Sequence, residues 1–477
     1  MKILFCSAEV VPFAKTGGLA DVAGTLPPEL AKLGVEIKIV LPRYKCIDAN
    51  KFNLTKVVDN FSVAKLADKV EVYFVENKKY FDRDGLYQDK GKDFPDNLDR
   101  FTYYCAQTMK LLKVINFKPD IIHCNDWQTA LIPVYLKTLY KNDPFYKNTK
   151  TVFTIHNLGY QGLFTKEEFS KTGLTEKEFS VGGLEFYGKT NLLKGGLLFA
   201  DKITTVSSTY AQEIQTEEFG CGLEGILQNR KKDLLGILNG INYQEWDPLT
   251  NKALSYNYDV NTLDGKYENK MQLQQLGNMK VDKNIPLFGM ITRLADQKGL
   301  DIFAEIIDQI CKLPLQFVLL GTGDQKYHEI FEELQKKCKN TFINLTFDAA
   351  LAYKIYAASD MFLMPSYYEP CGLGQLISLA FGTIPVVRKT GGLADTVVDY
   401  NQSKEDGNGF VFSGYKSEEL LEAIKRSLEV YKDSQQWNRL VVKAMNYDFS
   451  WGQSAKKYLH LYEELMSNRK PVTSNQK

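Results

Sequence analysis

The heptapeptide Lys-Thr-Gly-Gly-Leu-Ala-Asp occurs twice in this chain, at Lys15–Asp21 and at Lys389–Asp395. The copies begin 389 − 15 = 374 positions apart in a chain of 477 residues, one near each end. Paired glycines let a backbone approach a ligand closely and permit a positive φ, and the Ala-Asp run indicates a helix start, where free N–H groups favour an anion. The repeat therefore predicts two domains that each carry a loop for an anionic ligand and that face one another across a cleft.

The length of the chain also favours two domains, because a single hydrophobic core seldom extends over a chain of this size. Lys and Arg number 59 and Asp and Glu 58, which leaves a net charge of +1. A charge so close to zero supplies no general attraction to nucleic acid or to an anionic membrane. Apolar runs are far shorter than the ~18 residues of a membrane span. We therefore expect a cytoplasmic enzyme with no nucleic-acid or membrane partner.

The cysteines and histidines point to neither a disulfide framework nor a metal site. The eight cysteines include no C-x-x-C pair, and the apolar run before Glu9 is too short for a signal peptide. We therefore expect reduced thiols. The four histidines are not spaced as a ligand pair, so we expect no metal.

Short apolar runs that end at polar loops predict a doubly wound parallel sheet in the first half. A strand at Lys2–Ser7, a helix at Ala20–Leu33 and a strand at Val35–Leu41 form the first β-α-β unit. The other strands expected in this half are Val70–Val75, Ile121–His123, Thr151–His156 and Lys202–Val206, with helices at Arg100–Val114 and Thr129–Leu139.

The same pattern starts again in the second half, with a strand at Pro286–Ile291 and a helix at Asp301–Leu313. Further strands are expected at Gln316–Leu320, Met361–Met364 and Ile384–Val387, and a last helix at Trp451–Met466. The fold class is therefore α/β, with two doubly wound Rossmann-like domains, residues 1–243 and 244–450.

Arg293 and Lys298 follow a predicted strand within the segment R-L-A-D-Q-K-G. Open α/β sheets bind ligands at the carboxyl ends of their strands, and an Arg fork with a Lys point charge suits a diphosphate. If the diphosphate leaves, its charge grows as the bond breaks, and fixed cations then stabilise the transition state more than the ground state. The alternative is a pair of solvated surface cations.

Two more segments follow predicted strands. In Y-Y-E-P-C-G-L-G, Glu369 offers a fixed acceptor and the amides from Cys371 onward offer donors for sugar hydroxyls or a phosphate; the alternative is a capped helix start. His156 is followed by small and polar residues, which favours a site role over a structural one. The glycine loops match neither G-x-G-x-x-G nor the Walker pattern, which argues against a dinucleotide enzyme or a P-loop ATPase; for each loop the alternative is a tight turn.

Together these motifs resemble the bacterial glycogen synthases and the plant starch synthases. The matching segments, in family order from end to end, are K-T-G-G-L-A-D-V at 15–22, P-D-N-x-x-R-F at 95–101, N-D-W at 125–127, H-N-L-G-Y-Q-G at 156–162, N-G-I-N with W-D-P at 239–248, R-L-A-D-Q-K-G at 293–299, E-P-C-G-L at 369–373 and R-K-T-G-G-L-A-D-T-V at 388–397.

The resemblance implies a glycosyltransferase of the GT-B architecture with a deep cleft. Such an enzyme would transfer glucose from ADP-glucose to the non-reducing 4-OH of an α-1,4-glucan such as glycogen, retaining the anomeric configuration without a metal ion or cofactor. The final segment, residues 451–470, would cross back to the N-terminal domain.

The resemblance also assigns roles by position. His156 would lie beside the reacting carbon, Arg293 and Lys298 would neutralise the departing ADP, and Glu369 would hold glucose hydroxyls. The donor would further contact Lys15, Gly17, Gly18, Asp21, Asp126, Asn157, Asn239, Cys371, Gly372, Leu373, Thr390 and Gly391.

The chain departs from the family pattern at Gln128, where the family has His, at Gly374, where it has Thr, and at Ile377, where retaining relatives often carry a second Glu. A double displacement needs a carboxylate nucleophile about 5 Å from its partner, so the missing Glu favours front-face attack. Two rival hypotheses are a catalytically silent glucan-binding protein and another retaining transfer on the same fold. Four intact residues argue against the first: Lys15, Arg293, Lys298 and Glu369. The heptapeptide, absent from sucrose and trehalose-phosphate synthases, argues against the second.

Overall fold

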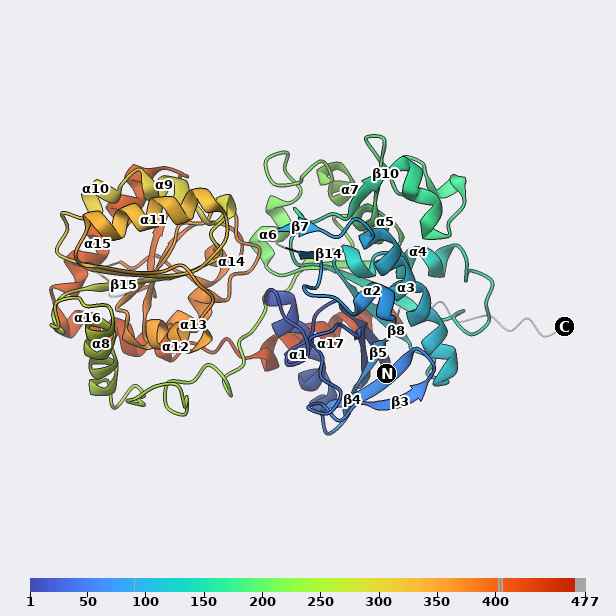
Figure 1. Ribbon diagram of the computed structural model, residues 1–477, viewed down its shortest axis with the longest axis horizontal. Helices are drawn as coiled ribbons and strands as arrows, with labels where there is room; N and C mark the ends of the chain where they lie inside the picture. Colours follow the sequence, from blue (N-terminus) through green and yellow to red (C-terminus); the bar gives the residue numbers. More distant parts are fainter. Residues whose placement is uncertain (90, 402–403, 405, 468–477) are drawn as a thin grey trace. The chain divides into compact units, whose positions relative to one another are not determined.

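The computed structural model describes residues 1–89, 91–401, 404 and 406–467, which form two compact α/β units (Figure 1). Unit 1 comprises Met1–Val206, Ala211–Asn239 and the C-terminal segment from Trp451; unit 2 comprises Ser207–Tyr210 and Gly240–Ser450. Each unit is built on a largely parallel sheet, which confirms the predicted fold class. Residues 468–470, the end of the segment predicted to cross back, lie outside the described residues.

Unit 1 is built on a nine-stranded sheet of order β14-β13-β9-β8-β1-β2-β5-β4-β3. Neighbouring strands from β14 to β5 run parallel, and β4 and β3 add an antiparallel hairpin at one edge. The strands are β1 (Lys2–Cys6), β2 (Glu36–Pro42), β3 (Thr55–Val58), β4 (Phe61–Ala67), β5 (Val70–Val75), β8 (Ile121–Asn125), β9 (Lys150–Ile155), β13 (Lys202–Thr205) and β14 (Leu234–Gly236). Because β1 lies between β8 and β2, the strand order reverses beside β1, where open α/β sheets bind ligands.

The helices of unit 1 are α1 (Gly18–Lys32), α2 (Lys78–Phe81), α3 (Asn97–Val114), α4 (Leu131–Lys137), α5 (Leu192–Phe199), α7 (Glu224–Asn229) and α17 (Trp451–Ser467), with 3-10 turns η1 (Trp127–Thr129), η2 (Lys166–Thr172) and η3 (Glu176–Glu178). Helix α6 (Ser208–Glu213) falls at the boundary of the two units. Two small antiparallel sheets complete the unit, one of β10 (Leu163–Thr165), β12 (Lys189–Asn191) and β11 (Glu185–Phe186), the other of β6 (Gln88–Asp89) and β7 (Lys92–Asp93).

The last helix, α17, packs beside α1 within unit 1 (Figure 1). Its Tyr462 hydroxyl lies 2.6 Å from Nδ1 of His123 on β8, and Nε2 of the same ring lies 2.6 Å from the Thr154 hydroxyl on β9. Burial lowers the pKa of His123 to about 3, so the ring is neutral at physiological pH. A neutral core histidine therefore joins α17 to the centre of the sheet.

This histidine makes stability depend on pH. The unfolded ring has a pKa near 6.5, so between that value and about 3 the unfolded state binds a proton that the folded state does not. The contribution of His123 to the free energy of unfolding is therefore complete above the unfolded pKa. It decreases as the pH falls, by up to about 2 kcal/mol between pH 6.5 and 5. We expect the melting temperature to drop less between pH 7.5 and 5 in His123→Gln than in the parent, whereas the exposed His460→Gln leaves the drop unchanged. Equal drops in all three proteins would contradict this role.

Unit 2 is built on a six-stranded parallel sheet of order β17-β16-β15-β18-β19-β20. Its strands are β15 (Leu287–Ile291), β16 (Gln316–Leu320), β17 (Thr341–Asn344), β18 (Met361–Met364), β19 (Ile384–Arg388) and β20 (Phe410–Phe412). The order reverses between β15 and β18, which marks the ligand edge of this sheet.

Helices cover both faces of that sheet, with α9, α11 and α15 on one side and α8, α12 and α13 on the other (Figure 1). The helical segments are α8 (Asp264–Leu276), η4 (Asp296–Lys298), α9 (Leu300–Ala304), α10 (Ile307–Ile310), α11 (Gln325–Lys337), α12 (Ala349–Ala358), α13 (Gly374–Ala380), α14 (Gly391–Thr396), α15 (Ser417–Tyr431) and α16 (Ser434–Met445). The single helix predicted at Asp301–Leu313 is interrupted at Glu305–Ile306, where α9 ends and α10 begins.

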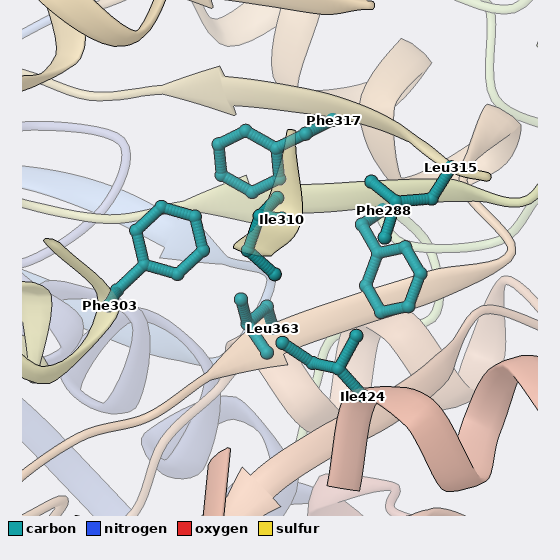
Figure 2. A pocket seen from close by; sticks show the side chains of 7 residues that line it. All are labelled: Phe288, Phe303, Ile310, Leu315, Phe317, Leu363 and Ile424. Carbon is teal, nitrogen blue, oxygen red and sulfur yellow. The ribbon is translucent and has the colours of Figure 1, made fainter. Parts of the chain in front are cut away.

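The core of unit 2 is tightly packed. Between β15, β16, β18 and the helices α9, α10 and α15, seven apolar side chains leave no space for a water molecule: Phe288, Phe303, Ile310, Leu315, Phe317, Leu363 and Ile424 (Figure 2). Such packing gives a rigid platform from which loops at the strand ends can be positioned.

Two sequence expectations concern features outside the sheets. Cys311, at the end of α10, and Cys338, at the end of α11, form a disulfide with Cα atoms 5.6 Å apart, so the expectation that all eight thiols are reduced is wrong for this pair. The helix ends bring together two cysteines 27 positions apart, a proximity that spacing alone does not show. Among the described residues, we find no helix with both the length and the apolar character required to cross a membrane.

Candidate active-site residues of the two units

In unit 1 the first glycine loop joins β1 to α1. Gly17 precedes the helix with φ −155°, which is extended backbone, so the positive φ that the sequence permits is not used here. A Cβ atom built on Gly17 would meet no atom within 4 Å. Nothing in the protein requires glycine at this position, and the space above it is open to a ligand. Lys15 Nζ donates to Asp21 Oδ1 at 2.7 Å, and the Lys15 side chain is 46% exposed.

The loop is fixed by hydrogen bonds to Glu9, a residue that sequence reasoning missed. The Glu9 side chain is buried, and its carboxylate accepts hydrogen bonds from the backbone N–H groups of Thr16 and Gly17. These two amides are therefore directed to a protein carboxylate. The signal available in the sequence was an acidic residue just after the first strand, at the carboxyl end where ligand loops start.

Asp126 follows β8, the neighbour of β1, and has φ 54°, which is unusual for a residue other than glycine. Its Oδ1 accepts a hydrogen bond of 2.8 Å from the backbone N–H of His156, which follows β9. Burial raises the pKa of Asp126 to about 7, and the charge of Glu9 adds to the rise, while the backbone N–H groups of His156 and Asn157 oppose it. The loops after three adjacent strands thus bring Asp126, His156 and the glycine loop to one edge of the sheet.

The His156 ring is oriented by Asn125. Nδ2 of Asn125 donates to the carbonyl of Cys6, so its Oδ1 faces Nε2 of His156 at 2.9 Å, and that nitrogen carries the proton. Burial lowers the pKa of His156 to about 3. At neutral pH the ring is therefore uncharged, and its Nδ1 is an acceptor. The next predicted residue, Asn157, accepts a hydrogen bond from the backbone N–H of Gly159 at 3.0 Å.

Two buried amides of unit 1 carry side-chain oxygens that have no hydrogen-bond partner among the described residues. They are Oδ1 of Asn239, predicted to bind the donor, and Oε1 of Gln128, where the family has His. A buried polar atom without a partner is costly, so each oxygen is suited to a ligand or a water molecule. The structure does not bring Asn239 into hydrogen-bond contact with the other predicted residues of this unit.

In unit 2, Lys298 and Glu369 form an ion pair. Lys298 Nζ donates to Glu369 Oε2 at 2.7 Å, and the Ser366 hydroxyl donates to the same oxygen at 3.0 Å. The Glu369 side chain is 8% exposed and the Lys298 side chain is 21% exposed. The sequence predicted each residue separately but not that they are partners. Arg293, from the same loop as Lys298, is exposed.

The loops after β15 and β18 are joined by hydrogen bonds. The Tyr367 N–H donates to the carbonyl of Gln297 at 2.9 Å, and Nε2 of Gln297 donates to the carbonyl of Tyr368 at 3.1 Å. These strands flank the point where the strand order reverses, so the contacts hold Lys298 and Glu369 at the ligand edge of the sheet.

The second copy of the heptapeptide packs differently from the first. Gly391 has φ +44°, and a Cβ atom there would lie 1.9 Å from the carbonyl oxygen of Glu369. A Cβ on Gly392 would lie 1.9 Å from the carbonyl oxygen of Cys371, and the Gly392 N–H donates to Glu369 O at 3.0 Å. Here glycine is required because two backbone segments touch. The contact brings Thr390 and Gly391 beside the segment that contains Cys371, Gly372 and Leu373.

The repeated aspartates also differ in their contacts. Asp21 pairs with Lys15, whereas Asp395 accepts hydrogen bonds from the backbone N–H groups of Ser208 and Thr209, at 2.6 and 3.0 Å, within unit 2. Identical sequence therefore does not give identical local structure. Among the residues that the structure describes, no group of three or more His, Cys, Asp or Glu side chains is arranged to hold a metal ion.

Two protein families match parts of this chain. Residues 2–229 match the family described as the starch synthase catalytic domain, and residues 275–440 match glycosyl transferases group 1. A glycogen synthase of Thermosipho melanesiensis is 49% identical over 98% of this chain and 100% of its own, and one of Thermotoga maritima is 47% identical over 98% and 99%.

Solved structures give the same result. The catalytic domain of starch synthase IV from Arabidopsis thaliana, bound to ADP and acarbose, superposes with a TM-score of 0.90 at 35% identity, covering 98% of this chain and 99% of its own. A sucrose-phosphate synthase from Thermosynechococcus elongatus shares the fold at a TM-score of 0.61 and 17% identity.

Two parallel-sheet Rossmann-like units with charged loops at the reversal point of each sheet define a glycosyltransferase of the GT-B type. The family match and the relatives are more specific. The chain belongs to the glycogen and starch synthase family.

Proposed function

We propose that this glycosyltransferase transfers glucose from ADP-glucose to the non-reducing 4-OH of an α-1,4-glucan and thereby elongates glycogen. The observation that carries the proposal is the Lys298–Glu369 pair, which is packed against the second glycine loop at the ligand edge of unit 2. The relatives called glycogen synthase and the starch synthase bound to ADP and acarbose support the choice of donor and acceptor.

In this proposal the cations of unit 2 act on the leaving group. Arg293 and Lys298 hold the diphosphate, and their charges stabilise it most as the bond to C1 breaks. Glu369 and the amides of Cys371, Gly372 and Leu373 hold the glucose hydroxyls. Thr390 and Gly391 complete this part of the donor site.

The residues of unit 1 act on the sugar and phosphate in the same proposed reaction. Lys15 supplies a cation beside the open face of Gly17, and Gly18 and Asp21 belong to the same loop. Neutral His156, proposed to lie beside the reacting carbon, offers Nδ1 as an acceptor for a nearby sugar hydroxyl. Asp126, Asn157 and Asn239 complete the set; the unpartnered Asn239 oxygen supports a contact with the donor.

Front-face attack fits the carboxylates of this chain. Ile377, where relatives often carry a second Glu, is buried among apolar side chains of unit 2 and supplies no nucleophile. In the proposed step the bond between C1 and the phosphate oxygen breaks, O4 of the acceptor bonds to C1 on the same face, and the O4 proton passes to the departing phosphate. Anomeric configuration is thus retained without a glucosyl-enzyme.

The product identifies the reaction. We expect new glucose units on a maltooligosaccharide to give the α-anomeric signal by NMR and one ADP to be released per unit added. The rates of glucose transfer and of ADP release should both be unchanged by EDTA. A β-linked product, or a trapped glucosyl-enzyme, would contradict the mechanism. Loss of activity that Mg²⁺ restores would contradict metal independence, and glucan binding without transfer would favour the silent binding protein.

A further inference from the structure

The carboxylate of Glu9 collects four hydrogen bonds. Oε2 accepts from the backbone N–H groups of Thr16 at 2.5 Å and Gly17 at 3.1 Å, and Oε1 accepts from the Thr16 hydroxyl at 2.6 Å and the Tyr87 hydroxyl at 2.8 Å. Glu9 is only 3% exposed. Burying a carboxylate is costly unless its oxygens are bonded, so this arrangement stabilises one conformation of the loop above it.

Tyr87 is fixed in turn by the segment P-D-N-x-x-R-F, which has no role in the proposed reaction. Nδ2 of Asn97 donates to the Tyr87 carbonyl at 2.9 Å, and Nη2 of Arg100 donates to the Leu86 carbonyl at 2.9 Å. Arg100 is fully buried, and its Nη1 donates to Oδ1 of Asn97 at 2.7 Å. The motif therefore works as a support for Tyr87, not as a ligand site.

The hydrogen bonds to Glu9 determine which groups of the glycine loop remain accessible to a ligand. Because the amides of Thr16 and Gly17 donate to Glu9, they are not directed to a phosphate. What remains accessible to a ligand is the open face of Gly17 and the half-exposed Lys15, whose amine pairs with Asp21. A fixed loop presents both without losing conformational entropy when a ligand binds.

We propose that Glu9 and Tyr87 are positioning residues, which fix the Thr16–Gly17 backbone so that Lys15 and the open face of Gly17 meet the donor in one geometry. The inference rests on the proposed function for the identity of the donor. Its structural part, a loop locked by a buried carboxylate, stands on the hydrogen bonds alone.

Glutamine at position 9 separates geometry from charge. In Glu9→Gln the amide oxygen can accept from both backbone N–H groups, and the amide nitrogen can donate to the Thr16 and Tyr87 hydroxyl oxygens. Glu9→Ala removes all four bonds, and Tyr87→Phe removes one. Tyr73→Phe is a matched control, because it deletes another tyrosine–glutamate hydrogen bond, 3.0 Å to Glu71, far from the loop in sequence.

We expect Glu9→Ala to lower kcat/KM for ADP-glucose by about 100-fold, chiefly through KM, and Tyr87→Phe by about 5- to 10-fold. Glu9→Gln should stay within about 3-fold of the parent, and Tyr73→Phe should match it. Wild-type kinetics in Glu9→Ala would overturn the proposal. So would a Glu9→Gln variant as impaired as Glu9→Ala, since charge and not geometry would then matter.

Hydrogen exchange gives a readout that needs no donor. The Thr16 and Gly17 amides should exchange slowly in the parent and in Glu9→Gln, faster in Tyr87→Phe, and fastest in Glu9→Ala if that variant folds. Equal exchange in the parent and Tyr87→Phe would overturn the role of Tyr87. A parent inactive with ADP-glucose but with protected amides would contradict the proposed donor and leave the locked loop in place.

Discussion

Replacing Lys298 with alanine is expected to lower kcat for glucose transfer by about 10²- to 10³-fold, or ~3–4 kcal/mol of transition-state stabilisation. Two effects act together. The cation that meets the growing charge of the leaving group is lost, and Glu369 stays buried with its hydrogen bond from Ser366 but without the ion pair. An unpaired buried carboxylate also disturbs the hydroxyl contacts proposed for it.

Steady-state kinetics and one control variant separate these effects from general damage. Lys326 also pairs with a residue of this loop, Asp296, but both side chains are exposed, so Lys326→Ala should keep the parental kcat. A rise in KM with kcat unchanged in Lys298→Ala would show that the lysine binds substrate and transition state equally, which contradicts the proposed role.

The second large effect is expected at Glu369. Glutamine keeps the size of the side chain and an oxygen that can accept from Lys298 and Ser366, so Glu369→Gln should fold normally. With the charge gone, we expect kcat to fall about 100-fold. A near-parental kcat with a normal melting curve would show that Glu369 has no role in the reaction.

The double variant tests whether the ion pair acts as a unit. Because Lys298 Nζ and Glu369 Oε2 are 2.7 Å apart, the effects of the two substitutions on kcat should not add. The kcat of the double variant, Lys298→Ala with Glu369→Gln, should therefore be little lower than that of Lys298→Ala alone. Full additivity of the two free-energy changes would show that they act independently.

Most of the two sheets could be predicted from the sequence, because buried parallel strands are continuous apolar runs that end at polar loops. Val70–Val75, Gln316–Leu320 and Met361–Met364 were predicted with the bounds that the structure shows. The antiparallel pair β3 and β4 was not predicted, since β3 is largely exposed and the buried residues of β4 do not form a continuous apolar run. The break at Glu305–Ile306 has no Gly or Pro to mark it.

Which residues of the site meet could be predicted only in part. The sequence identified Lys298, Glu369 and the second glycine loop by type and position, but their contacts join segments about 70 and 20 residues apart, which spacing does not reveal. Glu9 was missed because its partners are two backbone amides, the hydroxyl of Thr16 and a tyrosine 78 positions away. A sequence shows the types of side chain present, whereas the folded sheet decides which of them are neighbours.

The proposed transfer is tested by measuring incorporation of radiolabelled glucose into glycogen by this 477-residue chain, with ADP-glucose and UDP-glucose compared in one assay. We expect incorporation to be faster from ADP-glucose than from UDP-glucose and to fall by at least ~100-fold in Lys298→Ala. Incorporation from neither donor, by protein that is folded and still binds glycogen, would contradict the proposed transfer.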